Sequence, residues 1–402
     1  MLTALAYLGF VSLGLPDGLL GIAWPSIRAT FGLPLDALGA LLVLFTAGYL
    51  TSSFTSGWLL GRIGVGALLA LSCAATALSL TGYALAPAWW VMVALGVLAG
   101  LGAGAIDAGL NTFAAVRFSA RTVNWLHACY GVGAATGPVI MTSVLATSGR
   151  WQHGYAIVGG AQVLLALCFG LTRRWWPITH AAPERAPSAA PGRAPTTPLP
   201  SRSIIDTLSR PVVWMSMAVF FVYTGMEAAA GIWVFSLFTE ARGLPMQTAG
   251  MWVSVYWAAL TAGRLLSGVV VSVISVERLL RGCMLGIVLG AGLVWLNVAS
   301  LSSGLGLALM GLASAPIFPS LISTTPARLG VAHTAHGVGF QIAAAVLGQS
   351  LLPATVGVVA RSVGLESVGA VLFVAALVLL AAHETLTALG APSPRESQHG
   401  DM

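Results

Sequence analysis

Ionisable side chains are rare within the long apolar segments of this sequence. Only three acids and one base lie away from the ends of these segments: Asp17, Asp107, Glu227 and Arg264. A charged side chain at the centre of a membrane helix costs at least about 2.5 to 3.5 kcal/mol on insertion scales, so such residues usually serve a function. These four residues are the first candidates for proton transfer or substrate binding.

Asp107 and Asn111 are four residues apart and would share one face of a helix. We predict that Asp107 carries a proton, because removal of a carboxyl group from water favours its neutral form. Asn111 would hydrogen-bond the acid or a substrate. The alternative is that Asp107 is a structural buried acid, bonded to a neighbouring helix.

Asp17 and Glu227 are further candidates for proton coupling or for binding substrate hydroxyl groups, and Arg264 is a candidate substrate-binding residue. An ion pair between Glu227 and Arg264 would instead have a structural role, because each charge would compensate the other. The two roles can coexist.

Six more polar residues complete the predicted substrate-binding set. Side chains of His and Tyr can hydrogen-bond a polyol, and a His can titrate in the physiological range. The alternative for a lone His in a membrane helix is a bond to a backbone carbonyl. The six residues are His127, Tyr130, Tyr223, Tyr256, His336 and Gln341. Trp233, near the predicted outer end of its segment, is expected to anchor the helix at the membrane surface.

The composition excludes a water-soluble fold. Of the 402 residues, 57% are hydrophobic and 7% charged, with a mean hydropathy of +0.90, whereas soluble proteins have about 25% charged residues. The net charge of +6 does not indicate nucleic-acid binding, because the arginines are scattered between apolar segments. No metalloprotease, Walker or nucleophile-elbow motif occurs. We therefore expect that the protein is not an enzyme. We also expect it to have no catalytic residues, no metal site and no cofactor.

A helix needs about 20 apolar residues to cross the hydrocarbon core of a membrane. The sequence offers twelve such segments, which predicts an all-α membrane protein. They cover residues 2–24, 36–60, 64–86, 89–116, 124–146, 155–171, 212–239, 248–274, 279–299, 304–323, 336–360 and 363–382.

Arginine accumulates in the loops that stay in the cytoplasm. With the N-terminus inside, thirteen of the 18 basic residues fall on the cytoplasmic side and four on the other, while Arg264 lies within a segment. We therefore place both termini in the cytoplasm, in a bacterial-type inner membrane. Residues 175–210 are rich in proline and are predicted to form a flexible cytoplasmic linker, and residues 391–402 a disordered tail.

The chain resembles itself at a shift of about 210 residues, which indicates an internal repeat. The matches pair Asp17-Gly-Leu-Leu-Gly-Ile with Glu227-Ala-Ala-Ala-Gly-Ile, Gly39 with Gly250, Ser56-Gly57 with Ser267-Gly268, and Gly131-Val-Gly with Gly337-Val-Gly. We predict two pseudo-symmetric six-helix bundles, residues 1–174 and 211–390, related by an axis along the membrane normal with a substrate site between them.

These spans, linker and repeat resemble the major facilitator superfamily. Within it, the sequence looks most like the fucose-permease-like branch of sugar–proton symporters, on the strength of Ala105-Ile-Asp107-Ala-Gly-Leu-Asn111 and Leu126-His127-Ala-Cys-Tyr130. The resemblance implies transport by alternating access. One departure is Gly61, which stands where the superfamily usually has an Asp in the loop between the second and third spans.

The predicted function is therefore secondary active transport of a small polar solute, such as a sugar, coupled to protons. The protein would act as a monomer in the lipid bilayer, with the proton gradient as its driving force. The alternative is a proton-driven exporter of amphipathic compounds, because Gly133-Ala-Ala-Thr-Gly137-Pro138 resembles a signature of antiporters. A non-transporting membrane sensor is the third alternative, and it would need an output domain that the sequence lacks.

Overall fold

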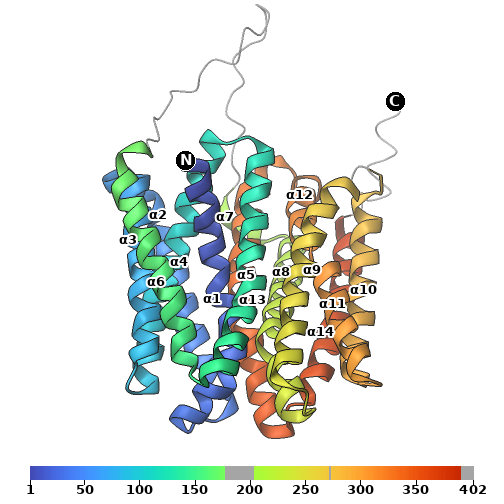
Figure 1. Cartoon of the computed structure of the whole chain (residues 1–402). Helices are drawn as coiled ribbons and strands as arrows, with labels where there is room; N and C mark the ends of the chain where they lie inside the picture. Colours follow the sequence, from blue (N-terminus) through green and yellow to red (C-terminus); the bar gives the residue numbers. More distant parts are fainter. Residues whose placement is uncertain (177–202, 271–272, 391–402) are drawn as a thin grey trace, which may run out of the picture.

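The computed structural model describes residues 1–176, 203–270 and 273–390, and every regular element in these ranges is helical. Among the described residues, eleven helices are long and apolar enough to cross a membrane. The remaining predicted span, residues 248–274, corresponds to the 25-residue helix α9 (Met246–Val270), which carries Arg264. Figure 1 shows the long helices side by side and roughly parallel, as expected for a membrane bundle.

The first half of the chain supplies six long helices. They are α1 (Leu2–Phe31), α2 (Leu38–Ile63), α3 (Val65–Leu85), α4 (Trp89–Arg117), α5 (Ala120–Ser148) and α6 (Trp151–Thr172), with short 3-10 turns η1 (Leu35–Ala37) and η2 (Arg173–Trp175). We call the end of the bundle at which α1 begins the proximal end, and the end at which it finishes the distal end.

The second half repeats this plan after a short helix, α7 (Ile204–Leu208). Its long helices are α8 (Pro211–Ser236), extended by a π turn, η3 (Leu237–Ala241), then α9, α10 (Val276–Leu296), α11 (Ser300–Ser314), α12 (Ile317–Leu329), α13 (Val331–Val363) and α14 (Ser367–Gly390). The tenth predicted span consists of α11 and α12 together, interrupted at residues 315–316.

Some helices are longer than the apolar segments predicted from sequence. α1 continues past residue 24 to Phe31 and ends at Gly32, whose φ of 64° gives it the left-handed conformation of a helix C-cap. Polar residues near a helix end can reach water, so the helix extends beyond the stretch that hydropathy detects.

The predicted linker and tail lie mostly outside the described residues, which resume at 203 and end at 390. Both described ends of the predicted linker are structured. Trp176 is buried and packs against Phe113 and Phe169. Thr207 of α7 contacts Nδ1 of His333 through its hydroxyl oxygen at 2.9 Å. The flexible segment predicted over 175–210 is therefore too long at both ends.

Helix packing inside the two halves follows the same pattern. In the first half α1 packs on α5, α2 on α4, and α3 on α4 and α6; in the second, α8 packs on α13, α9 on α11, and α10 on α11 and α14. Glycines allow this close approach: a Cβ on Gly133 would lie 2.1 Å from the carbonyl oxygen of Val11, and one on Gly348 would lie 2.2 Å from that of Phe221. Small residues drive helix association in lipid in this way.

The two halves meet through three helix pairs, α1 with α8, α2 with α13, and α5 with α9. Three glycines mark these contacts in the distal part of the bundle. A Cβ on Gly39 would lie 3.0 Å from Ala354 Cβ, one on Gly357 3.4 Å from Asp36 Cα, and one on Gly250 2.1 Å from Thr142 Oγ1.

The halves separate toward the proximal end. Gly57, Gly268 and Gly339 lie five helical turns from Gly39, Gly250 and Gly357, respectively, and so on the same helix faces. Within the described part of the chain, nothing lies within 4 Å of a Cβ built on any of these three glycines. The structure is thus closed between the halves at its distal end and parted near its proximal end.

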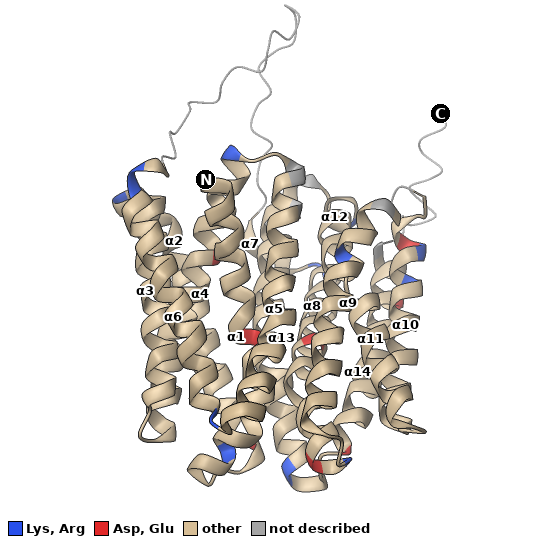
Figure 2. Ribbon diagram, viewed as in Figure 1, with Lys and Arg blue, Asp and Glu red and all other residues tan. Residues whose placement is uncertain are grey.

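Ion pairs between the halves strengthen the distal contact. Arg28 at the end of α1 pairs with Glu240, and Arg361 Nη1 lies 3.0 Å from Asp36 Oδ1. Figure 2 shows that charged residues gather at the two ends of the bundle, with few at mid-height. That distribution fits an apolar belt in which ionisable residues are exceptional.

We expect Gly250→Val to destabilise the protein and Gly268→Val to leave its stability nearly unchanged. The Thr142 side chain places Oγ1, Cβ and Cγ2 all within 3.0 Å of the added Cβ at residue 250, so rotating this side chain cannot relieve the clash, which should cost about 1 to 3 kcal/mol. Thermal unfolding in detergent measures both variants. Equal destabilisation by the two substitutions would contradict the asymmetric packing.

Candidate functional site

Asp107 lies part-way along α4 and is half-buried. Its two carboxylate oxygens accept separate hydrogen bonds: Oδ2 from the hydroxyl of Tyr49 at 2.7 Å, and Oδ1 from Nδ2 of Asn111 at 2.9 Å. The bond from Asn111 to the acid is one of the two roles that the sequence predicts for this asparagine. Tyr49, on α2, was not among the residues predicted from sequence. The sequence feature that could have pointed to it is a tyrosine within an apolar segment, because a buried phenol hydroxyl usually finds a hydrogen-bond partner.

His127 lies on α5 and interacts electrostatically with Asp107 and with Arg264 of α9. Its ring is exposed and makes an edge contact with Phe10 of α1, with ring centroids 5.2 Å apart. It therefore stands between an acid of the first half and a base of the second.

Asp17 lies near the middle of α1, where close packing on α5 positions it. The α1–α5 contact is tight because a Cβ on Gly14 would lie 2.1 Å from the carbonyl oxygen of Tyr130. The Tyr130 hydroxyl donates to Asp17 Oδ2 at 2.6 Å. The Asp17 side chain is exposed although α1 packs against α4, α5, α6 and α8, so it borders open space inside the bundle.

Glu227 occupies the matching place on α8 and is buried. The Tyr223 hydroxyl donates to its Oε2 at 2.5 Å, and the Tyr256 hydroxyl donates to its backbone carbonyl at 3.0 Å. Arg264 Nη2 lies 3.8 Å from Glu227 Oε1. The ion pair considered as a structural alternative from sequence is therefore present.

These residues form one polar group that crosses the boundary between the halves. Across the boundary, Arg264 lies close enough to Tyr130, and Asp17 close enough to Glu227, for their charges to influence each other's ionisation. We call this set the central polar group; it comprises Asp17, Tyr49, Asp107, Asn111, His127, Tyr130, Tyr223, Glu227, Tyr256 and Arg264.

Two predicted substrate-binding residues lie outside the central polar group. Gln341 is buried within the second half, where Nε2 donates to Ser216 Oγ at 2.5 Å and Oε1 accepts from Thr325 at 3.0 Å. It holds α8, α12 and α13 together. His336 is half-buried on α13, and no bond joins it to the central polar group within the described residues.

The sequence predicts that Trp233 anchors its helix at the membrane surface, and this prediction is wrong. It is fully buried, and its Nε1 donates to the carbonyl oxygen of Pro353 at 2.8 Å. A backbone carbonyl has two lone pairs, so the Pro353 carbonyl can accept from the indole N–H beside any bond within its own helix. Trp233 therefore joins α8 to α13 in the core of the second half.

The Gly-Pro segment of α5 packs against α1. A Cβ on Gly137 would lie 2.6 Å from the Leu15 carbonyl oxygen, and one on Gly18 would lie 2.5 Å from Pro138 Cδ. Close helix packing thus accounts for the small residues of this segment.

We expect Glu227→Gln to destabilise the protein by about 3 kcal/mol, since removing one partner leaves a mostly buried charge uncompensated. Arg264→Gln should have a similar effect, and the double variant should lose less stability than the two single losses together. Thermal unfolding of all four proteins measures this coupling. The control is Arg281→Gln, in an exposed pair with Glu384, which should cost less than about 1 kcal/mol. Additive losses at 227 and 264 would contradict the pairing.

Comparison with known proteins identifies the family. The family model described as Major Facilitator Superfamily matches residues 6–353. No curated protein matches the chain. Among solved structures, a mutant of the nucleoside transporter NupG is similar with a TM-score of 0.77 at 13% identity, covering 96% of this chain and 100% of that one.

Two further structures share the fold. The D-xylose–proton symporter aligns with a TM-score of 0.70 at 13% identity, over 94% of this chain and 96% of that one. A bacterial homologue of the human lysosomal transporter Spinster, inward-facing and occupied, aligns with a TM-score of 0.71 at 12% identity, over 98% and 97%. At these identities the likeness shows the fold alone. With its family match, twelve-helix architecture and repeated halves, the chain belongs to the major facilitator superfamily of membrane transporters.

Proposed function

We propose that this protein is a proton-coupled transporter that moves a small polar solute, such as a sugar or a related compound, by alternating access. One observation carries the proposal. The central polar group brings three carboxyl groups and one arginine together from the two halves. Transporters of this architecture bind substrates between their halves.

The charge balance of the central polar group favours proton coupling. It holds Asp17, Asp107 and Glu227 but a single permanent cation, Arg264. In a medium of low dielectric constant, like charges within one site cannot all ionise, and protons supply the missing positive charge. Asp107 is the proposed proton carrier because its partners, Tyr49 and Asn111, are neutral.

The groups with free hydrogen-bonding capacity suit a hydroxylated solute. Asp17 and His127 are exposed, and Asn111, Tyr130 and Arg264 are half-buried. Together they offer donors and acceptors to a ligand with several hydroxyl groups. The names of two similar structures, a nucleoside transporter and a D-xylose–proton symporter, agree with this class of substrate.

The glycine pattern at the boundary supports alternating access. Gly57 and Gly268 match each other in the repeat, and so do Gly39 and Gly250, which make the distal contact. In a state closed at the proximal end, Gly57 and Gly268 would take the place of Gly39 and Gly250 as points of close approach. The arginine distribution supports a cytoplasmic location of the proximal end and of both termini, and we propose a bacterial-type inner membrane.

Packing of the Gly-Pro segment on α1 accounts for the sequence feature that favoured an exporter.

Uptake into proteoliposomes under an imposed pH gradient of each sign tests the direction of coupling. A symporter accumulates solute when the external side is acidic, and an antiporter expels it. Candidate solutes can be selected by thermal shift, since a ligand at about 100 times its Kd stabilises the native state by about 2.7 kcal/mol.

We expect Asp107→Asn to abolish accumulation of solute driven by a pH gradient while exchange of solute across the membrane at equal pH continues. Asparagine keeps the hydrogen-bonding shape of the neutral acid but cannot release a proton. Counterflow and gradient-driven uptake in proteoliposomes measure the two activities. Tyr49→Phe is the matched control, because it removes a partner of Asp107 and leaves the titratable group in place. Unchanged gradient-driven accumulation in Asp107→Asn would refute the role of this residue.

We expect Gly268→Val to reduce transport at least about fivefold although it leaves folding intact, because an added side chain at a point of helix contact costs about 1 to 3 kcal/mol in the state closed at the proximal end. Transport rate and thermal stability are measured on the same preparation. The control is Gly160→Val, since no atom of the described chain lies within 4 Å of a Cβ on α6 at that position. Full activity in Gly268→Val would exclude close approach at this glycine.

A further inference from the structure

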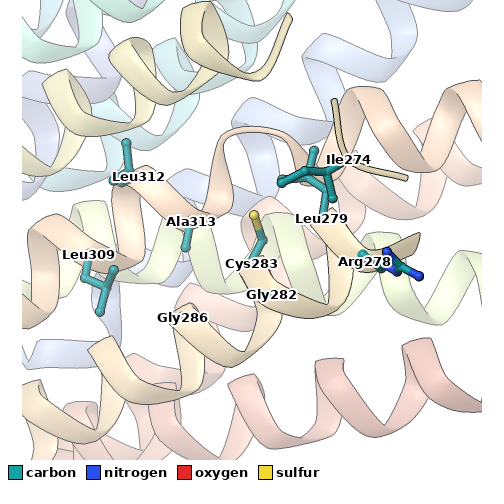
Figure 3. A pocket seen from close by; sticks show the side chains of 9 residues that line it. All are labelled: Ile274, Arg278, Leu279, Gly282, Cys283, Gly286, Leu309, Leu312 and Ala313. Carbon is teal, nitrogen blue, oxygen red and sulfur yellow. The ribbon is translucent and has the colours of Figure 1, made fainter. Parts of the chain in front are cut away.

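A groove of about 330 Å³ lies between α10 and α11, near the proximal end of the second half. Figure 3 shows its lining, with Arg278 at one end and apolar side chains along the remainder. Gly282 and Gly286 form its floor on α10, and Leu309, Leu312 and Ala313 form its wall on α11. A single cation therefore stands at the mouth of an otherwise apolar trough.

Arg278 is the uncompensated charge of this region. The next arginine on α10, Arg281, forms two 2.7 Å hydrogen bonds with Glu384. No ion pair of Arg278 is present within the described residues, and its side chain is exposed. The nearest acid in sequence, Glu277, interacts electrostatically with Arg281 and Arg328.

The groove faces away from the boundary between the halves. In the described part of the chain, the main packing partners of α10 are helices of its own half, α11, α12 and α14. Large apolar side chains beside the groove are exposed, among them Leu285, Leu289 and Leu312. Residues exposed on the outer surface of a membrane bundle face lipid, so lipid is the medium that reaches this groove.

We infer that the groove binds an anionic phospholipid, whose phosphate pairs with Arg278 and whose acyl chain lies along Gly282 and Gly286. From Arg278 to Gly286 the helix rises about 12 Å, which gives the chain an apolar path from the headgroup into the hydrocarbon core. Basic pockets between helices on the cytoplasmic side of a membrane recognise anionic headgroups. This lipid site is separate from the central polar group and from the proposed transport path.

Cys283 lines the groove and is a reporter of its occupancy. A variant with Cys73, Cys129 and Cys168 replaced by alanine leaves it as the single thiol. We expect phosphatidylglycerol, added to detergent micelles, to slow modification of Cys283 by N-ethylmaleimide about fivefold more than phosphatidylcholine of the same acyl chains, as one basic residue discriminates anionic lipid by about this factor.

In Arg278→Gln, the two lipids should slow the modification of Cys283 equally. In Arg62→Gln, which changes an arginine at the proximal end of the first half, phosphatidylglycerol should still slow it more than phosphatidylcholine. A second single-thiol variant retaining Cys168, which is exposed on α6 outside the groove, controls for the effect of micelle charge on thiol reactivity and should respond equally to both lipids. Inorganic phosphate should give no protection. Equal protection of Cys283 by the two lipids, persistence of the difference in Arg278→Gln, or the same difference at Cys168 would each overturn the lipid site.

Discussion

Ionisable side chains held away from bulk water need partners, and this requirement determines how the centre of the molecule is built. Each acid of the central polar group receives a hydrogen bond from a tyrosine: Asp17 from Tyr130, Asp107 from Tyr49 and Glu227 from Tyr223. A phenol is well suited to this place, since its ring is apolar and only its hydroxyl must reach a polar group. The polar centre is thus satisfied without further permanent charges.

The helices around this centre can approach one another only where side chains are absent. In the first half, Gly14 and Gly133 bring α1 and α5 together, and that contact is what carries the Tyr130 hydroxyl to Asp17. Between the halves, glycine plays a different part. Gly39 and Gly250 make the distal contacts, while Gly57 and Gly268 occupy the same faces where the halves are apart. The same residue type therefore fixes geometry within a half and, in the proposed transport cycle, would permit two geometries between halves.

The sequence is informative about features that repeat along one helix. The four-residue spacing predicts the contact of Asp107 with Asn111, and hydropathy predicts the spans, because both depend on local periodicity. Contacts between helices depend on which faces meet, and spacing does not specify that. Tyr49 reaches Asp107 from another helix, and Gln341 turns into its own half to bond Ser216 and Thr325. The internal repeat was more informative about which helix faces meet, since the paired glycines Gly39 and Gly250 both lie at contacts between the halves.

Asp107 and its hydrogen-bonding partners all belong to the first half, and this arrangement constrains how a proton there could influence the other half. An effect must pass through a group that interacts with both halves. His127 is such a group, because it interacts electrostatically with Asp107 and with Arg264, and Arg264 in turn pairs with Glu227. For a protonated His127, neutralising Asp107 removes an attraction and leaves the repulsion of Arg264. The electrostatic balance across the boundary then changes with the protonation of one residue in one half, without direct contact between the acids concerned.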